Sequence, residues 1–117
     1  MEILTTMENG VLIVTLKGRM DTDGTREFQE ISGGWHASSI ILDCCHLDYI
    51  CSSALRAFLH MKRESDKAGK KLVLARSSGL VDRIIEISGF DNIFFRYPSV
   101  HDALCDVAVK ADAVQMG

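Results

Sequence analysis

The chain has 117 residues, 47% of them hydrophobic and 25% charged, which are the proportions of one ordinary globular domain. Its formal net charge of −3 provides no basic field and argues against a nucleic-acid partner. No apolar run approaches the roughly 20 residues that span a bilayer, and no basic-then-apolar export signal opens the chain. We therefore expect no membrane partner and a cytoplasmic location.

The first predicted elements are two strands, at about residues 2–6 and 11–17. Asn9-Gly10 lies between them and is a strong short-range signal for a hairpin. A short helix should follow, with Thr22 or Asp23 as its N-cap, because short polar side chains accept a hydrogen bond from a free backbone N–H.

The centre of the sequence is predicted to be a buried strand over residues 39–43, an acidic loop, and a helix over residues 52–68. Ser52 and Ser53 open that helix. One serine is expected to be the N-cap, and the other would lie near the positive end of the helix dipole. A phosphate group at that position would be tolerated.

The second half of the chain continues the alternation. A strand is predicted at residues 71–75, a helix capped by Ser77-Ser78, a short strand at residues 92–95, and a last helix from Pro98-Ser99. The order is β-β-α-β-α-β-α-β-α. Strands separated by helices need crossovers, so the later strands should be parallel and the opening hairpin antiparallel. We therefore expect an α/β fold with a mixed sheet covered by helices.

The four cysteines form no Cys-x-x-Cys pair, and we expect reduced thiols. Cys44 and Cys45 are interpreted as small buried hydrophobes. Cys51 precedes a helix, where a thiolate is stabilised, so a redox-sensing thiol is an alternative role for it. The histidines show no metal-ligand spacing and no phosphate-binding loop is present, so we expect no metal and no cofactor.

Four segments together resemble an anti-sigma-factor antagonist of the STAS domain family. The resemblance covers about residues 1–110, expected to be one domain, and residues 111–117 are expected to be a frayed tail. The segments are Leu16–Asp21, Ile40–Asp43 with Leu47–Ile50, Ser52–Leu55, and Ile87–Phe90 with Ile93-Phe94.

The resemblance implies a STAS-like fold and a non-enzymatic partner switch. The family's phosphorylated serine falls on Ser53. The unphosphorylated protein would bind an anti-sigma factor that is also a serine kinase, phosphorylation would release it, and a PP2C-type phosphatase would reset it. Cys51 replaces the family's usual Asp and Ala54 its usual Gly. The implied partner-binding residues are Asp21, Thr22, Asp23, Cys51, Ser52, Ser53 and Ala54.

Three other functions are compatible with parts of the sequence. A STAS module can regulate a pathway that involves no sigma factor. A response-regulator receiver domain would use Asp43 as phosphoacceptor, but it needs an acidic pair after the first strand and a lysine after the fifth, and both are missing here. A small hydrolase or thiol enzyme would use Ser53 or Cys51, but the chain has no Gly-x-Ser-x-Gly elbow, so we expect no catalytic residues.

Overall fold

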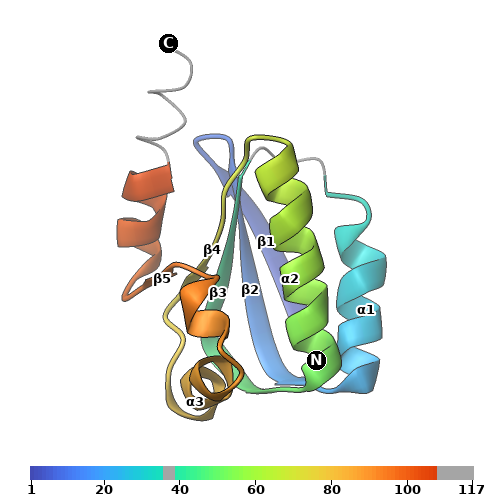
Figure 1. Cartoon of the computed structure of the whole chain (residues 1–117). Coiled ribbons are helices and arrows are strands. Elements are labelled where there is room, and N and C mark those ends of the chain that lie inside the picture. The colour runs from blue at the N-terminus through green and yellow to red at the C-terminus, as the bar shows by residue number, and fades with distance from the viewer. Residues whose placement is uncertain (36–38, 108–117) are drawn as a thin grey trace.

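The computed structural model describes residues 1–35 and 39–107, so the predicted tail at residues 111–117 lies outside the described residues. Strands and helices alternate in the predicted order (Figure 1). The elements are β1 (Glu2–Glu8), β2 (Val11–Met20), α1 (Thr22–Ser32), β3 (Ser39–Ile50), α2 (Ser52–Lys67), β4 (Leu72–Ala75), α3 (Gly79–Ile87), the 3₁₀ helix η1 (Phe90–Asn92), β5 (Arg96–Tyr97) and a C-terminal helix over residues 100–107.

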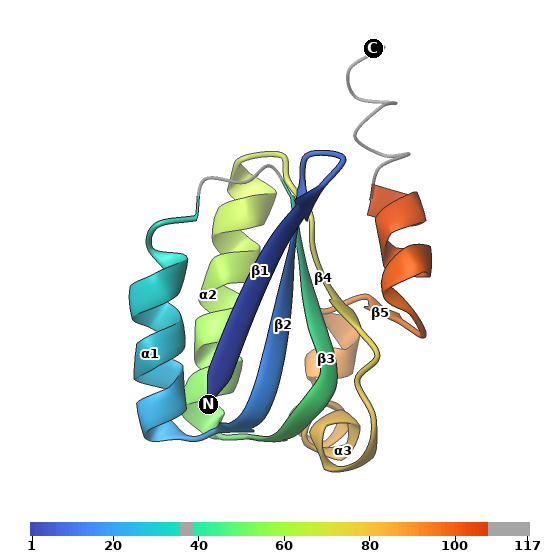
Figure 2. The ribbon, with the colours of Figure 1, turned by 180° about the vertical axis from the view of Figure 1, so that it is seen from behind.

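The sheet has the strand order β1-β2-β3-β4-β5. β1 pairs with β2 antiparallel, whereas the pairs from β2 to β5 are parallel, which confirms the predicted mixed sheet. Asn9 and Gly10 both have positive φ, at 53° and 77°, as a tight two-residue hairpin turn requires. β1 forms one edge of the sheet, and the view from behind in Figure 2 shows it in front of β2.

Residues along a strand alternate between the two faces of the sheet, and the central strands β2, β3 and β4 bury residues on both faces. On β2, Leu12, Val14 and Leu16 face the larger core cluster, which α1, α2 and α3 complete. Val11 and Ile13 face the opposite cluster, which the C-terminal helix covers through Ala103, Leu104 and Val107. Two buried faces explain the continuous apolar runs of the central strands.

The helix caps differ from the predictions. The N-cap of α1 is Asp21, whose Oδ1 accepts a hydrogen bond from Gly24 N–H at 2.9 Å, so the predicted caps Thr22 and Asp23 are wrong. The N-cap of α2 is Cys51, and both serines lie inside the helix. The backbone of Cys51 is extended because its N–H donates to Met20 O at 3.0 Å. This bond continues the pairing of β2 and β3 up to the N-cap of α2.

Two strand boundaries also differ. β3 runs to Ile50 instead of ending at residue 43, because β2 pairs with it as far as Met20, across two register shifts. The segment predicted as an acidic loop is therefore mostly strand. The last strand is Arg96–Tyr97 rather than residues 92–95, because Phe94 is buried in the core and the backbone pairs with β4 only beyond it.

Tyr97 links the short strand β5 to the C-terminal helix. Its hydroxyl donates a hydrogen bond to the Asp106 carboxylate. Burial, followed by this hydrogen bond, raises the pKa of Tyr97 to about 12. The helix itself begins after Ser99, whose Oγ accepts from Asp102 N–H at 3.0 Å.

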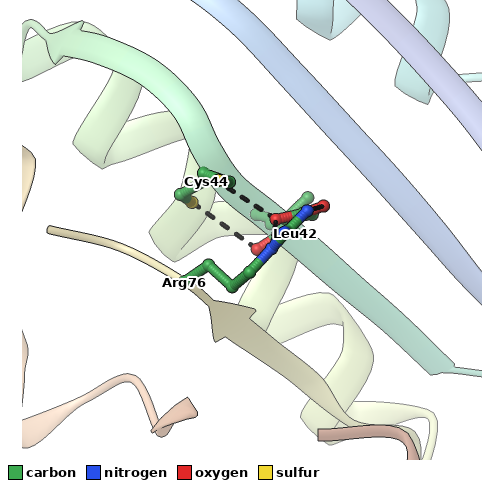
Figure 3. A network of polar contacts seen from close by, with 5 residues as sticks. Leu42, Cys44 and Arg76 are labelled. Carbon is green, nitrogen blue, oxygen red and sulfur yellow. Dashed lines mark hydrogen bonds and ion pairs between the residues drawn. The ribbon is translucent and has the colours of Figure 1, made fainter. Parts of the chain in front are cut away.

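The strand β3 carries one buried charged residue. Asp43, expected at the end of a strand, lies within β3 and is only 3% exposed. Its carboxylate accepts hydrogen bonds from Arg76 Nε and Nη2 at 3.0 and 2.6 Å. Figure 3 shows Arg76 reaching β3 beside Leu42 and Cys44. A buried and paired carboxylate is a poor phosphoacceptor, which argues against the receiver-domain alternative.

The neighbouring cysteines do not share one environment. Cys44 is buried, its Sγ donates to Leu42 O at 3.5 Å, and burial raises the pKa of its thiol to about 12. Cys45 is exposed, so its interpretation as a buried hydrophobe is wrong. Both cysteines lie where the pairing of β2 with β3 shifts register, between Asp43 and His46, so strict alternation along the strand is interrupted there.

Candidate functional site

The candidate site lies where β2 and β3 end and α1 and α2 begin, at the same edge of the sheet (Figure 1). Met20 and Ile50 are register partners, and the bond from Cys51 N–H to Met20 O ties the two strand-to-helix junctions together. Parallel strands place their carboxyl ends at one edge, so the N-termini of both helices are neighbours there.

Ser53 is in the first turn of α2, two residues after the N-cap. It is half-buried, and its Oγ lies 3.0 Å from Cys51 Sγ. Ser52 precedes it and is exposed. Ser53 is thus partly accessible to solvent and is not one of the buried residues.

The first turn of α2 favours an anion. The first helical hydrogen bond runs from Leu55 N–H to Cys51 O, so the N–H groups of Ser52, Ser53 and Ala54 have no acceptor within the helix. Their dipoles point out of the helix toward this edge of the sheet. A negative group on Ser53 would be stabilised there by roughly 0.3–1 kcal/mol if exposed.

Cys51 connects the two helices. Its Sγ contacts Thr25 Oγ1 of α1 at 3.6 Å as well as Ser53 Oγ of α2. Desolvation of the sulfur opposes ionisation, but the hydroxyls of Ser53 and Thr25 and the nearby N–H groups of Ala54 and Ser53 favour the thiolate. Together they hold the pKa of Cys51 below its ordinary value. The two N–H groups act by proximity, because neither makes a capping hydrogen bond of normal geometry with the sulfur.

An exposed acidic surface adjoins Ser53. Asp21, Thr22 and Asp23 are all exposed at the start of α1. Asp23 pairs with Arg26 at 3.4 Å on the same exposed helix face. This acidic rim, defined here as Asp21, Thr22 and Asp23, is joined to the serine turn through the backbone bond between the two junctions.

The remaining residues of the site divide by burial. Ala54, expected to contact a partner, is 0% exposed and packs in the core, so its side chain is not available at the surface. Thr25 also belongs to the site, because it is 3% exposed and contacts Cys51. It was not predicted from the sequence. Its place four residues after the N-cap, on the inward face of α1, was the one feature of the sequence that could have indicated this role. Arg19 stacks over Tyr49 at 4.5 Å near the same end of β2 and β3.

Within residues 1–35 and 39–107, no group of three or more His, Cys, Asp or Glu side chains is arranged to hold a metal ion. Among the same residues, the helices are all too short or too polar to cross a membrane.

The mixed sheet and the paired helix N-termini define a class of small α/β domains. Comparisons with known proteins identify the family within this class. The family model for the STAS domain matches residues 2–103. BtrV from Bordetella bronchiseptica, named provisionally as an anti-sigma factor antagonist, is 30% identical over 91 residues, covering 74% of this chain and 77% of BtrV. The chain belongs to the STAS domain family.

Solved structures show the same fold. An anti-sigma factor antagonist from Mycobacterium paratuberculosis superposes with a TM-score of 0.82 at 21% identity, covering 91% of this chain and 92% of that one. Unphosphorylated SpoIIAA of Bacillus, an anti-sigma factor antagonist, has a TM-score of 0.77 at 19% identity, covering 91% and 96%. At these identities the likeness concerns the fold alone, and it confirms the predicted STAS-like mixed sheet.

Proposed function

We propose that this protein is a cytoplasmic anti-sigma factor antagonist, switched by phosphorylation of Ser53. Its unphosphorylated form binds an anti-sigma factor that is also a serine kinase. The kinase then transfers phosphate to Ser53 and lets go, and a PP2C-type phosphatase resets the chain. The observation that carries the proposal is the half-buried hydroxyl of Ser53 at the N-terminus of α2, beside the acidic rim.

The physical effect of the phosphate is local charge. A phosphoserine adds about −1.5 to −2, which takes the net charge from −3 to about −5. The helix terminus accommodates this charge, so the scaffold stays folded. A partner docked on the acidic rim, Asp21, Thr22 and Asp23, instead meets a concentrated negative patch that must be desolvated on binding.

The central experiment is a pull-down from the native cell with wild-type, Ser53→Asp and Ser52→Ala chains, followed by incubation with ATP and mass spectrometry. Wild type and Ser52→Ala should retain an ATP-dependent kinase and take phosphate on Ser53. Ser53→Asp should bind that kinase more weakly by calorimetry. Phosphate on another residue, or equal affinity of Ser53→Asp, would defeat the proposal.

Ser53→Ala separates the fold from the modification. It should remain folded and lose no more than about 0.5–1.5 kcal/mol in urea unfolding, because the side chain does not cap the helix and gives up only its contact with Cys51. It should still bind the kinase but take no phosphate.

A further inference from the structure

Cys51 occupies an unusual position beside Ser53. Its sulfur lies between two hydroxyls from different helices, Thr25 Oγ1 at 3.6 Å and Ser53 Oγ at 3.0 Å. Thr25 is 3% exposed and cannot turn to solvent, so its contact fixes the sulfur at the boundary between α1 and α2. The other contact of the sulfur then restrains the Ser53 side chain.

The chemistry of a thiol suits this position. A thiol both donates and accepts hydrogen bonds, and either partner of the Cys51–Ser53 contact can be the donor. The free hydroxyl of Ser53 can donate its proton to the sulfur. Once Oγ is esterified it has no proton, and it and the phosphate oxygens can only accept. A carboxylate at position 51 would be an acceptor only and would repel a phosphate.

We propose that Cys51 is the positioning residue of the switch. Its sulfur holds the Ser53 hydroxyl in one orientation before transfer, and its S–H donates to the phosphoserine afterwards. This inference rests on the proposed function of Ser53. It assigns Cys51 no part in bond making.

The transfer itself balances without the cysteine. Ser53 Oγ bonds to the γ-phosphorus of ATP held by the kinase, the bond from that phosphorus to the bridging oxygen breaks, and ADP leaves. The hydroxyl proton passes to a base of the kinase. Holding Oγ in one rotamer shortens the search for the attacking geometry, so the effect of Cys51 belongs in the rate of transfer rather than in docking.

The first test needs no kinase. Three-bond Hα–Hβ couplings of Ser53, measured by NMR, report its χ1 rotamer. Wild type and Cys51→Ser should show one dominant rotamer, and Cys51→Ala should show averaged couplings. A single hydrogen bond of ordinary strength shifts the rotamer ratio by about 3- to 10-fold. A single unchanged rotamer in Cys51→Ala would overturn the positioning role.

The second test is phosphate transfer from γ-labelled ATP, using the kinase retained by immobilised wild-type chain. Cys51→Ala should lower kcat by about 3- to 10-fold and leave KM for the chain unchanged. Cys51→Ser should restore kcat, because a hydroxyl also donates and accepts. Cys45→Ala is the matched control, since it removes an exposed cysteine that lies on β3, and it should behave as wild type.

The outcomes separate the two proposals. Wild-type chains that take no phosphate on Ser53 overturn the proposed function and this inference with it. Equal kcat for wild type and Cys51→Ala overturns the inference alone. A change confined to KM would mean that Cys51 contacts the kinase, and that also refutes a positioning role. Urea unfolding of each variant checks that the compared chains are folded.

Discussion

The buried ion pair between Asp43 and Arg76 should contribute measurably to the free energy of unfolding. The Asp43 side chain is 4% exposed in the middle of β3, whereas the Arg76 side chain is 41% exposed at the end of β4. The guanidinium bonds the carboxylate through Nε and Nη2, at 3.0 and 2.6 Å. The only other hydrogen bond to that carboxylate that the described residues show comes from Cys45 N–H at 3.3 Å.

We predict that Arg76→Met destabilises the protein by about 2–3 kcal/mol. Methionine keeps an unbranched side chain, and the positive φ of 58° costs the same in both proteins. Breaking a buried ion pair from one side costs about 3–5 kcal/mol when the remaining charge is stranded. The loss predicted for Arg76→Met is smaller than this because the guanidinium is partly solvated and one N–H donor to Asp43 remains.

Urea unfolding measures the effect. With a slope of about 1–3 kcal/mol per M, the midpoint should fall by about 0.7–3 M. The double variant Asp43→Asn/Arg76→Met should recover part of the loss, because no buried charge is left unpaired. Arg63→Met, at an exposed position on α2, is the matched control and should change stability by less than about 0.5 kcal/mol. If Arg76→Met behaves like this control, the reasoning from a buried charge is refuted.

Three further predictions concern the caps, the glycines and the alkaline limit. Asp21→Ala should cost about 0.5–2 kcal/mol in urea unfolding because it removes the N-cap of α1, and a larger loss from Thr22→Ala would contradict that assignment. Gly24→Ala should destabilise despite its better helix propensity, since a Cβ there would lie 2.9 Å from a backbone oxygen of β2, whereas Gly33→Ala should add about 0.4–1 kcal/mol because its nearest neighbour is 3.6 Å away. Absorbance near the tyrosinate band should contain a phase with a midpoint of about 12 in wild type, and Tyr97→Phe should lack that phase. Unfolded tyrosine ionises near 10, so the contribution of Tyr97 to stability is complete below about pH 10 and is lost as pH rises toward 12; the variant should lack this decline.

The element order could be predicted because each signal is local. Asn9-Gly10 adopts positive φ without tertiary help, and the alternating and 3.6-residue apolar patterns depend only on neighbours along the chain. The motif around Ser52-Ser53 predicted a surface serine at a helix start, and the structure places Ser53 there, half-buried. Whether it is phosphorylated stays a prediction.

Several errors involve partners that are distant in sequence, whereas the N-cap of α1 was misplaced although Asp21 and Gly24 are close in sequence. β3 extends to Ile50 because β2 continues beside it, and Cys51 rather than a serine is the N-cap because Met20 holds its N–H in an extended conformation. The buried pairing of Asp43 was not predicted because its partner, Arg76, lies 33 positions away.

The sequence by itself determined the order of the elements and the mixed sense of the sheet, because hairpin turns and apolar periodicity act over a few residues. Only the tertiary structure decided which atoms surround Ser53. The 3.6 Å contact between Thr25 and Cys51 joins two helices that share no local pattern. Packing of distant segments selects such contacts, since they form only when the sheet brings both helix ends to one edge.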